Sequence, residues 1–405
     1  MLMPLLEQFR VPLEGLSLCR HDKRYNFASY LAIWPCAFEV WSVLSQVVRP
    51  GALSLLAAVA TAEASGCTYE TSHATRRVKK YGAFQDGCLF GPRKTQLEAA
   101  VRLGRRLEVC RGDRENLGCH FQTVVLAAAM EAYSSKVAQA IGFDLERQFK
   151  KENKAKVILP QTTSRKKKAN HRKKFFLLRR TAFSSHGGVQ FKDIPWRYPG
   201  LGSYLEECLG YSFPVLSKIK CRKARLSIAF ALEKTFSKDE NFNNGGALPL
   251  KLRIAAAAIY ARVTKDAHLD VAFSRLANRF QVNLAEAFHI ADINPLFEYN
   301  YDDASNSDDT STNSSKSGDN TTKKQRTSCY LRLARLLSSP APLSIPADLY
   351  RNLQDRCDPR TIVDLVHVVA IATMLHQLFK AFNDDDLSNT PTILEGDREE
   401  EEHKG

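Results

Sequence analysis

Four long apolar stretches constrain the fold of this 405-residue chain more than any other feature of its sequence. In each of them alanine and leucine recur at spacings of three and four residues, which places them along one face of an α-helix. Alternating runs of β-branched residues, which would indicate strands, are few. The sequence therefore predicts an all-α fold, with its main helices at Leu53–Ala64, Val124–Ile141, Leu250–Val263 and Ile362–Phe382.

Length and composition exclude several classes of protein. At about 150 residues per domain, the chain predicts two or three domains. Hydrophobic residues make up 44% and charged residues 25% of the chain, as in globular proteins. No apolar run reaches the roughly 18 residues that cross a bilayer, and the N-terminus lacks the basic and apolar segments of a secretory signal. We therefore expect a protein without membrane spans, inside the cell, in the cytoplasm or the nucleus.

Much of the net charge of +14 is concentrated in one segment. Between Lys150 and Arg180, thirteen Lys or Arg residues stand against one acid, Glu152. Such a run repels itself and has no helical or strand periodicity, so residues 150–185 are predicted to be a disordered linker. Three interpretations of this linker remain open: a simple spacer, a nuclear-import signal, or a weak, sequence-independent contact with nucleic-acid phosphates.

The linker divides the chain into predicted folded domains at residues 1–149 and 186–383. Within the second domain, residues 302–325 are dominated by Ser, Thr, Asn and Asp and are predicted to form a disordered insertion. Residues 384–405 contain two runs of acidic side chains and are predicted to be a disordered tail.

The two predicted domains share an order of sequence elements. When Pro50 is aligned with Pro249, each proline precedes an Ala-rich apolar segment, and Cys67 falls opposite Asp266 without a gap. Proline fits the first turn of a helix, so both segments are expected to begin helices at the same point. A later apolar helix also repeats, as 124–142 and 362–382. The sequence therefore predicts two tandem helical bundles that arose by internal duplication.

At these residues the chain resembles the carboxymuconolactone decarboxylase and alkylhydroperoxidase AhpD-like superfamily. The resemblance rests on the proline-led apolar helix, on the turn Gly66-Cys67-Thr-Tyr-Glu-Thr-Ser-His73, and on the closing helix that ends at Gly142. Two such units in one chain, of which only the first keeps the cysteine, are similar to the layout of sestrins. The resemblance implies thiol-dependent peroxide reduction, with Cys67 as the attacking thiol and Glu70 and His73 as proton handlers.

The candidate site departs from the family pattern. Family peroxidases carry a second cysteine three residues after the first and a histidine seven residues after it, whereas this chain has Glu70 and, at plus six, His73. A carboxylate at Glu70 would repel a thiolate, and plus six lies about 120° around a helix from the cysteine. A resolving thiol would have to come from another protein or from a cysteine elsewhere in the first domain, for which the candidates are Cys36, Cys88, Cys110 and Cys119.

Two functions remain in competition. The first is an antioxidant protein with an altered one-cysteine site, which would need a thiol reductant or a resolving protein. The second is a catalytically inactive regulatory or interaction scaffold with a protein partner, since the second domain already has Asp266, Leu269 and Ala272 at the three site positions. The ten cysteines contain no CxxC pair, so no metal or cofactor is predicted. We expect a monomer or a low oligomer.

Overall fold

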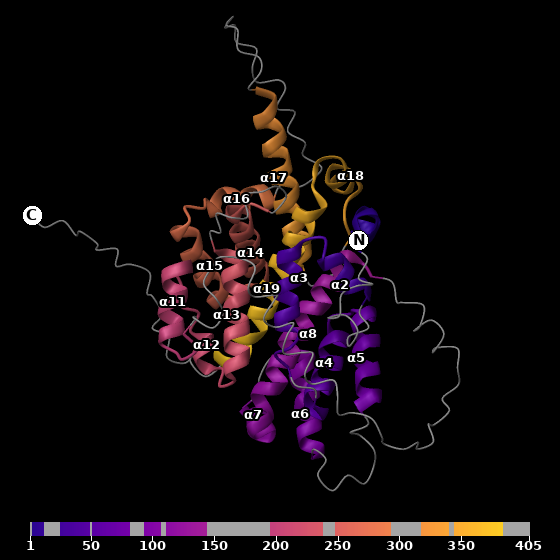
Figure 1. The fold of residues 1–405 in the computed structure, drawn as a ribbon, viewed down its shortest axis with the longest axis vertical. Coiled ribbons are helices and arrows are strands. Elements are labelled where there is room, and N and C mark those ends of the chain that lie inside the picture. Colours follow the sequence, from indigo (N-terminus) through magenta and orange to yellow (C-terminus); the bar gives the residue numbers. More distant parts are fainter. Residues whose placement is uncertain are drawn as a thin grey trace, which may run out of the picture.

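The structure is a computed structural model that describes residues 2–11, 25–48, 51–81, 93–106, 111–143, 195–237, 248–292, 317–339 and 344–383. The described residues contain helices and no strand, which confirms the predicted all-α class (Figure 1). The predicted linker at 150–185, residues 302–316 of the predicted insertion and the predicted tail at 384–405 lie outside these ranges.

The part of the chain before residue 144 supplies the first group of helices. In chain order they are α1 (Met3–Leu6), the 3₁₀ turn η1 (Glu7–Phe9), α2 (Tyr25–Leu31), α3 (Pro35–Leu44), α4 (Ala52–Ala64), α5 (Thr68–Tyr81), α6 (Lys94–Arg106), α7 (Arg111–Leu117), the 3₁₀ turn η3 (Gly118–His120) and α8 (Phe121–Ile141). The helices α4 and α8 are the two that the alanine and leucine spacing predicts.

The part of the chain from residue 195 onward supplies the second group. In chain order they are α11 (Gly200–Leu209), α12 (Val215–Lys218), α13 (Arg222–Phe236), α14 (Leu250–Thr264), α15 (Ala267–Arg279), α16 (Leu284–Asp292), α17 (Ser317–Ser338), α18 (Ala347–Arg356) and α19 (Pro359–Asn383). The helices α14 and α19 lie where the sequence pattern predicts them.

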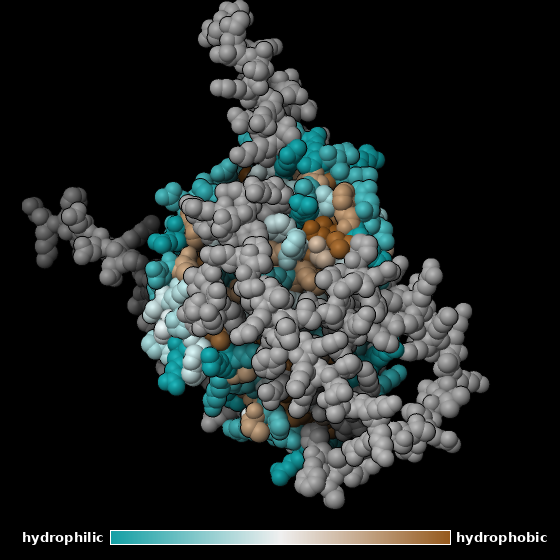
Figure 2. Space-filling view, in the orientation of Figure 1, coloured by the Kyte–Doolittle hydropathy of each residue, from teal (hydrophilic) through white to brown (hydrophobic). Residues whose placement is uncertain are grey.

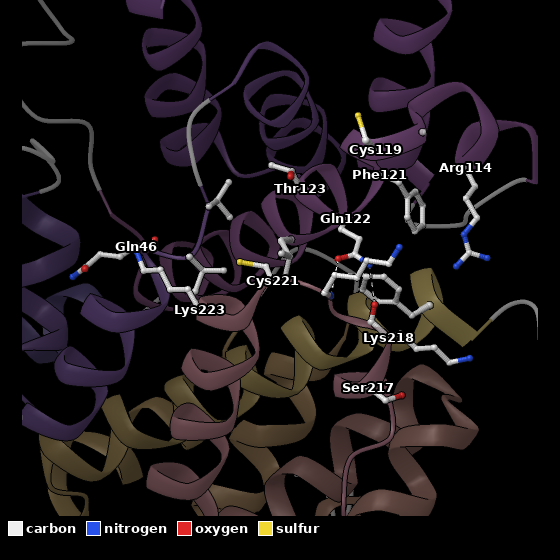
Figure 3. Close-up of a pocket in the computed structure, with 16 residues that line it drawn as sticks. Gln46, Arg114, Cys119, Phe121, Gln122, Thr123, Ser217, Lys218, Cys221 and Lys223 are labelled. Carbon is white, nitrogen blue, oxygen red and sulfur yellow. Dashed lines mark hydrogen bonds between the residues drawn. The ribbon is translucent and has the colours of Figure 1, made fainter. Parts of the chain in front are cut away.

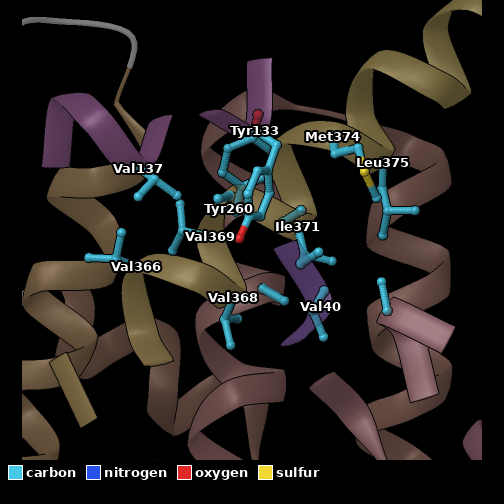
Figure 4. Packing of buried hydrophobic residues seen from close by; sticks show 14 of the residues in the cluster. Val40, Tyr133, Val137, Tyr260, Val366, Val368, Val369, Ile371, Met374 and Leu375 are labelled. Carbon is cyan, nitrogen blue, oxygen red and sulfur yellow. The ribbon is translucent and has the colours of Figure 1, made fainter. Parts of the chain in front are cut away.

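Helices α8 and α19 pack against one another at the centre of the molecule (Figure 1). Figure 4 shows Val369 and Ile371 of α19 near Tyr133 of α8, Tyr260 of α14 and Val40 of α3. One continuous cluster of buried apolar side chains therefore contains residues from both predicted domains.

Most large apolar side chains of the described residues are inside the protein. The exposed ones are Phe9 and Val271. On the face drawn in Figure 2, hydrophilic residues make up much of the described rim. Helix α19 is long and apolar enough to cross a membrane over Pro359–Phe382, but its apolar stretch is wholly buried. A core helix of a soluble protein meets the same criteria, so this one helix is weak evidence for a span.

The turns that follow α4 and α14 have matching hydrogen bonds. After α4, Gly66 takes a left-handed φ of 68°, and the N–H of Cys67 donates to the carbonyl of Ala62 at 3.1 Å. After α14, Lys265 takes a φ of 54°, and the N–H of Asp266 donates to the carbonyl of Ala261, also at 3.1 Å. Both turns are Schellman-type helix ends. Descent of the two groups from one duplicated bundle stays a prediction.

One segment of the predicted insertion has a different structure. Helix α17 begins at Ser317, so residues 317–325, expected to be a disordered loop, are helical instead. The sequence analysis missed this helix start, because Ser, Asp and Asn are common both in loops and at helix termini. The first turns of α17 extend beyond the body of the molecule (Figure 1).

Helices α4 and α6 approach closely at Gly104. A Cβ atom added to this residue would lie 2.5 Å from the backbone oxygen of Ala57 and 2.8 Å from the Cβ of Ala60. No side chain fits there without moving one helix away from the other. Gly112 of α7 provides a contrast, because a Cβ added there meets nothing within 4 Å.

We therefore expect Gly104→Ala to lower the free energy of unfolding by about 1–3 kcal/mol through overpacking. The matched change Gly112→Ala should be neutral or should raise it by up to about 1 kcal/mol, because alanine has the higher helix propensity. Urea unfolding of both variants measures the difference. Equal stability of the two would show that α4 and α6 do not touch at this point.

Candidate functional site

The predicted nucleophile Cys67 lies at the start of α5, directly after the Gly66 turn. It is the residue before the helix, and its sulfur accepts a hydrogen bond from the backbone N–H of Glu70 at 3.5 Å. This is the position and the bond of a helix N-cap. The residue is 4% exposed. The thiol therefore has a structural role in ending one turn and starting the next helix.

The surroundings of Cys67 favour the neutral thiol. Burial raises the pKa of Cys67 to about 12, the Glu70 backbone N–H lowers it, and the nearby carboxylates of Glu70 and Glu131 raise it further. A peroxidatic cysteine attacks as the thiolate. At neutral pH this environment therefore opposes the peroxide reduction that the family resemblance implies for Cys67, Glu70 and His73.

Glu70 and His73 are buried near Cys67, on the first turns of α5. Glu70 is fully buried and His73 is 6% exposed. The imidazole of His73 packs against the ring of Tyr69, with the ring centroids 4.5 Å apart. The structure thus brings the three predicted site residues into one buried part of the first group of helices. Their catalytic role stays a prediction.

The structure adds an acid–base pair that the sequence analysis missed. Glu131 of α8 is 3% exposed and pairs with Arg77 of α5 across 2.7 Å. A pocket of about 190 Å³ lies beside this pair, with Ser54 and Ser134 also in its wall. The sequence feature that could have indicated this pair is the single carboxylate in the apolar, Ala-rich stretch of α8. A carboxylate is costly to bury without a partner.

The predicted resolving cysteines are spread over the structure. The thiol of Cys36 donates to the carbonyl of Lys234 in the second group, with 3.8 Å between sulfur and oxygen. Burial raises the pKa of Cys36 to about 12. Cys119 is exposed within η3, and Cys88 and Cys110 lie outside the described residues.

Asp266 has the N-cap role in the second group that Cys67 has in the first. One of its oxygens accepts from the backbone N–H of Leu269 at 3.0 Å, and the other lies 2.5 Å from Nδ1 of His376 on α19. Burial raises the pKa of Asp266, but the bonds from His376 and Leu269 outweigh burial and hold that pKa below its usual value. This corner is a buried hydrogen-bonded pair that fixes α15 to α19.

A buried polar network joins the two groups of helices. Tyr133 of α8 hydrogen-bonds with Nδ1 of His367 on α19 at 2.9 Å, and Nε2 of His367 lies 3.3 Å from the hydroxyl of Thr235 on α13. Close by on α19, Asp364 accepts from the backbone N–H of Leu248 at 3.1 Å and lies 4.0 Å from Nε of Arg253. These bonds specify one arrangement of α8, α13, α14 and α19.

Burial sets the charge states in this network. It lowers the pKa of His367 to about 3, assisted by the charge of Arg253. It also raises the pKa of Asp364 to about 6, although Arg253 and the Leu248 N–H act in the opposite direction. Among the described residues, no group of three or more His, Cys, Asp or Glu side chains is placed to hold a metal ion.

A larger pocket of about 1140 Å³ lies where the two groups of helices meet (Figure 3). We call it the junction pocket. Its polar and charged lining side chains come from both groups of helices, and no Asp or Glu is among its described lining residues. The cationic lining residues are Arg114, Lys218, Lys220 and Lys223, and the apolar ones are Val47, Val48, Phe121, Leu126 and Phe382.

Gln122 holds the two sides of the junction pocket together. Its side-chain N–H donates to the carbonyl of Lys218 at 2.9 Å, and its side-chain oxygen accepts from the backbone N–H of Lys220 at 2.8 Å. Figure 3 shows this side chain in the middle of the lining residues. One residue of α8 thereby fixes the end of α12, where Lys218 lies, and the segment between α12 and α13, where Lys220 lies.

No known family model, curated protein or solved structure matches this chain. The junction pocket was not found from the sequence, because its walls come from segments about 100 residues apart in the chain. The sequence feature that could have pointed to it was the run of bases from Lys218 to Lys223.

Substitutions at Cys67 and Glu70 test the N-cap role of Cys67 and the raised pKa of its thiol. We expect Cys67→Ser to retain most of the stability of the protein, because serine also accepts the N-cap hydrogen bond, and Cys67→Ala to lose about 1 kcal/mol more. In the unsubstituted protein, alkylation of Cys67 should stay slow up to pH 9 and should become faster in Glu70→Gln, because the Glu70 charge raises the thiol pKa. Mass spectrometry of the Cys67 peptide measures these rates. Rapid alkylation at pH 7 would contradict the buried-thiol assignment.

The pKa values of Asp364 and His367 predict opposite pH dependences. His367 is neutral in the folded protein, and between pH about 6.5 and 3 it gains a proton when the protein unfolds. Its contribution to the free energy of unfolding is therefore complete above pH 6.5 and is lost as the pH falls. Asp364 holds its proton in the folded protein up to pH about 6. Its contribution to the free energy of unfolding is therefore complete below pH 3.8 and is lost as the pH rises. Between pH 4 and 6 the two effects cancel.

Single substitutions should expose each effect. From pH 6 to pH 4, the free energy of unfolding should fall in Asp364→Asn and rise in His367→Gln, by about 1 kcal/mol per pH unit. Urea unfolding at several pH values measures both slopes. The same slope in the two variants would show that these groups do not titrate as their burial implies.

Proposed function

We propose that this protein is a non-catalytic regulatory protein that binds an anionic small molecule in the junction pocket. The observation that carries the proposal is the charge of the pocket wall. Four cationic side chains and no carboxylate occur among its described lining residues. A cleft lined by charges of one sign attracts ligands of the opposite sign and raises their local concentration.

The apolar part of the wall narrows the class of ligand. Val47, Phe121 and Phe382 are buried and contribute to the lining. The guanidinium of Arg114 lies 5.0 Å from the centre of the Phe121 ring, so cationic and apolar groups adjoin. Pockets of this kind use apolar surface for affinity and a few charged groups for orientation. The ligand class that fits is a carboxylate, phosphate or sulfonate with an apolar body.

The position of the pocket supports a regulatory role. Its walls include the segment after α3, α7, η3 and α8 from the first group, and α12, the start of α13 and the end of α19 from the second. A ligand that binds only the packed arrangement stabilises that arrangement in proportion to its concentration. Occupancy would therefore change how firmly the two groups of helices are joined.

Peroxide reduction at Cys67 is the second candidate function. The position of Cys67 at the start of α5 favours it, because a helix N-terminus stabilises a thiolate. Burial has the larger effect, since a pKa of about 12 leaves roughly one thiolate in a hundred thousand thiols at pH 7. The binding function is therefore the better supported of the two.

Binding of 8-anilinonaphthalene-1-sulfonate, which joins a sulfonate to an aromatic body, tests the proposal. We expect saturable binding to the folded full-length chain that weakens in about 0.5 M salt, because salt screens the lysines. Lys220→Glu should weaken binding at least about tenfold, since it places a negative charge in the wall while the backbone N–H still bonds to Gln122.

Lys79→Glu is the matched control, because Lys79 is exposed on α5 and does not line the pocket. It makes the same change in net charge and should leave binding within about twofold of the unsubstituted protein. Equal loss in the two variants would show that the probe responds to overall charge. No loss in either would contradict an anion site in the junction pocket.

A further inference from the structure

Two cysteines far apart in the sequence meet in the second group of helices. Cys329 lies in α17 and is 5% exposed, and Cys357 is the residue that ends α18 and is partly exposed. Two contacts between the same segments, Arg356 with Gln325 and Tyr330 with Thr361, bring the two cysteines close together, and both are free thiols. Neither belongs to the site that the sequence predicts, and neither lines the junction pocket.

Contacts on both sides of the thiol pair hold it in place. Arg332 of α17 pairs with Asp348 of α18 across 3.0 Å, and Arg356 at the end of α18 donates to the side chain of Gln325. Next to Cys329, the hydroxyl of Tyr330 hydrogen-bonds with that of Thr361, in the first turn of α19, at 2.6 Å. The sulfur atoms therefore meet at a corner where three helices are tied together.

The surroundings give the two sulfur atoms different roles. The hydrogen bond from Cys357 lowers the pKa of Cys329, burial opposes this, and the charges of Arg332 and Arg356 lower it further. The same hydrogen bond and burial raise the pKa of Cys357. Cys329 is thus the thiol that ionises. Cys357 keeps its proton and donates a hydrogen bond to the sulfur of Cys329. This is the reverse of the situation at Cys67, where burial dominates.

We propose that Cys329 and Cys357 are a peroxide-reactive dithiol that closes reversibly to a disulfide. Cys357 is the partly exposed member of the pair, so we place the approach of hydrogen peroxide on its side. Reactive cysteines that act as redox sensors commonly combine a stabilised thiolate with a second thiol poised to resolve the oxidised product. The proposal stands apart from ligand binding in the junction pocket.

The chemistry balances with hydrogen peroxide as the oxidant. The Cys329 thiolate attacks one peroxide oxygen, the O–O bond breaks, and the leaving hydroxide takes a proton to become water, which leaves a sulfenic acid on Cys329. The sulfur of Cys357 then attacks the Cys329 sulfur, forms the S–S bond and loses its proton as the sulfenic hydroxyl leaves as a second water. One peroxide is reduced to two waters while two thiols are oxidised to one disulfide. A dithiol reductant reverses the disulfide by thiol exchange.

Mass spectrometry of the full-length chain tests the proposal. After treatment with one equivalent of hydrogen peroxide, we expect the protein to lose the mass of two hydrogen atoms, to contain a Cys329–Cys357 linked peptide, and to recover its mass with dithiothreitol. Cys357→Ser should trap the sulfenic acid on Cys329, detected as a dimedone adduct, because serine still donates a hydrogen bond but cannot resolve the product.

Cys329→Ser should slow the reaction with peroxide at least about tenfold, because it removes the thiolate. Cys208→Ser is the matched control, since Cys208 is also partly exposed but burial raises its pKa, and it should react within about twofold of the unsubstituted protein. A disulfide that joins other cysteines, or a Cys329→Ser variant that reacts at the unsubstituted rate, would overturn the proposal.

Discussion

The fold depends on the burial of α19, a helix with no face toward solvent. Apolar side chains surround nearly its whole circumference, and nearly every described side chain between Thr361 and Phe382 is buried. A helix of this kind has to be enclosed by other helices, because exposing any side of it to water costs free energy. Its neighbours come from both parts of the chain, with α8 and α3 from the first and α12, α13, α14, α15 and α17 from the second. The two predicted domains consequently share one core, and Asp364, His367 and His376 of α19 find hydrogen-bond partners in that core.

The corners after α4 and α14 show how one backbone geometry can carry different chemistry. Each corner ends a helix with a left-handed residue and begins the next with a side chain that accepts a backbone N–H. A sulfur does this at Cys67 and a carboxylate at Asp266, and the carboxylate also gains His376 as a hydrogen-bond partner. The sequence position alone does not determine whether such a residue is reactive. Burial and neighbouring charges decide it, and at Cys67 they favour the protonated thiol.

Features formed by residues close together in the sequence could be predicted, whereas features formed by packing between distant segments could not. Helix periodicity is local, so α4, α8, α14 and α19 were found close to their observed bounds. The start of α17 was missed, because polar residues at a helix terminus have the composition of a loop. Cys67 directly precedes α5 and Glu70 and His73 lie on its first turns, all three buried, and their catalytic role stays a prediction. The Arg77–Glu131 pair, the junction pocket and the Cys329–Cys357 contact depend on packing between distant segments, which no spacing rule encodes.

The position of α19 in the chain also bears on how the protein is made. Every other described helix emerges from the ribosome before α19 does, including α8, against which it packs. Until α19 arrives, the apolar side of α8 has no permanent cover, and a nascent chain with such a surface is prone to aggregate. Final assembly therefore waits until α19 has been synthesised, and chaperone binding to the uncovered α8 surface would protect the chain during that interval.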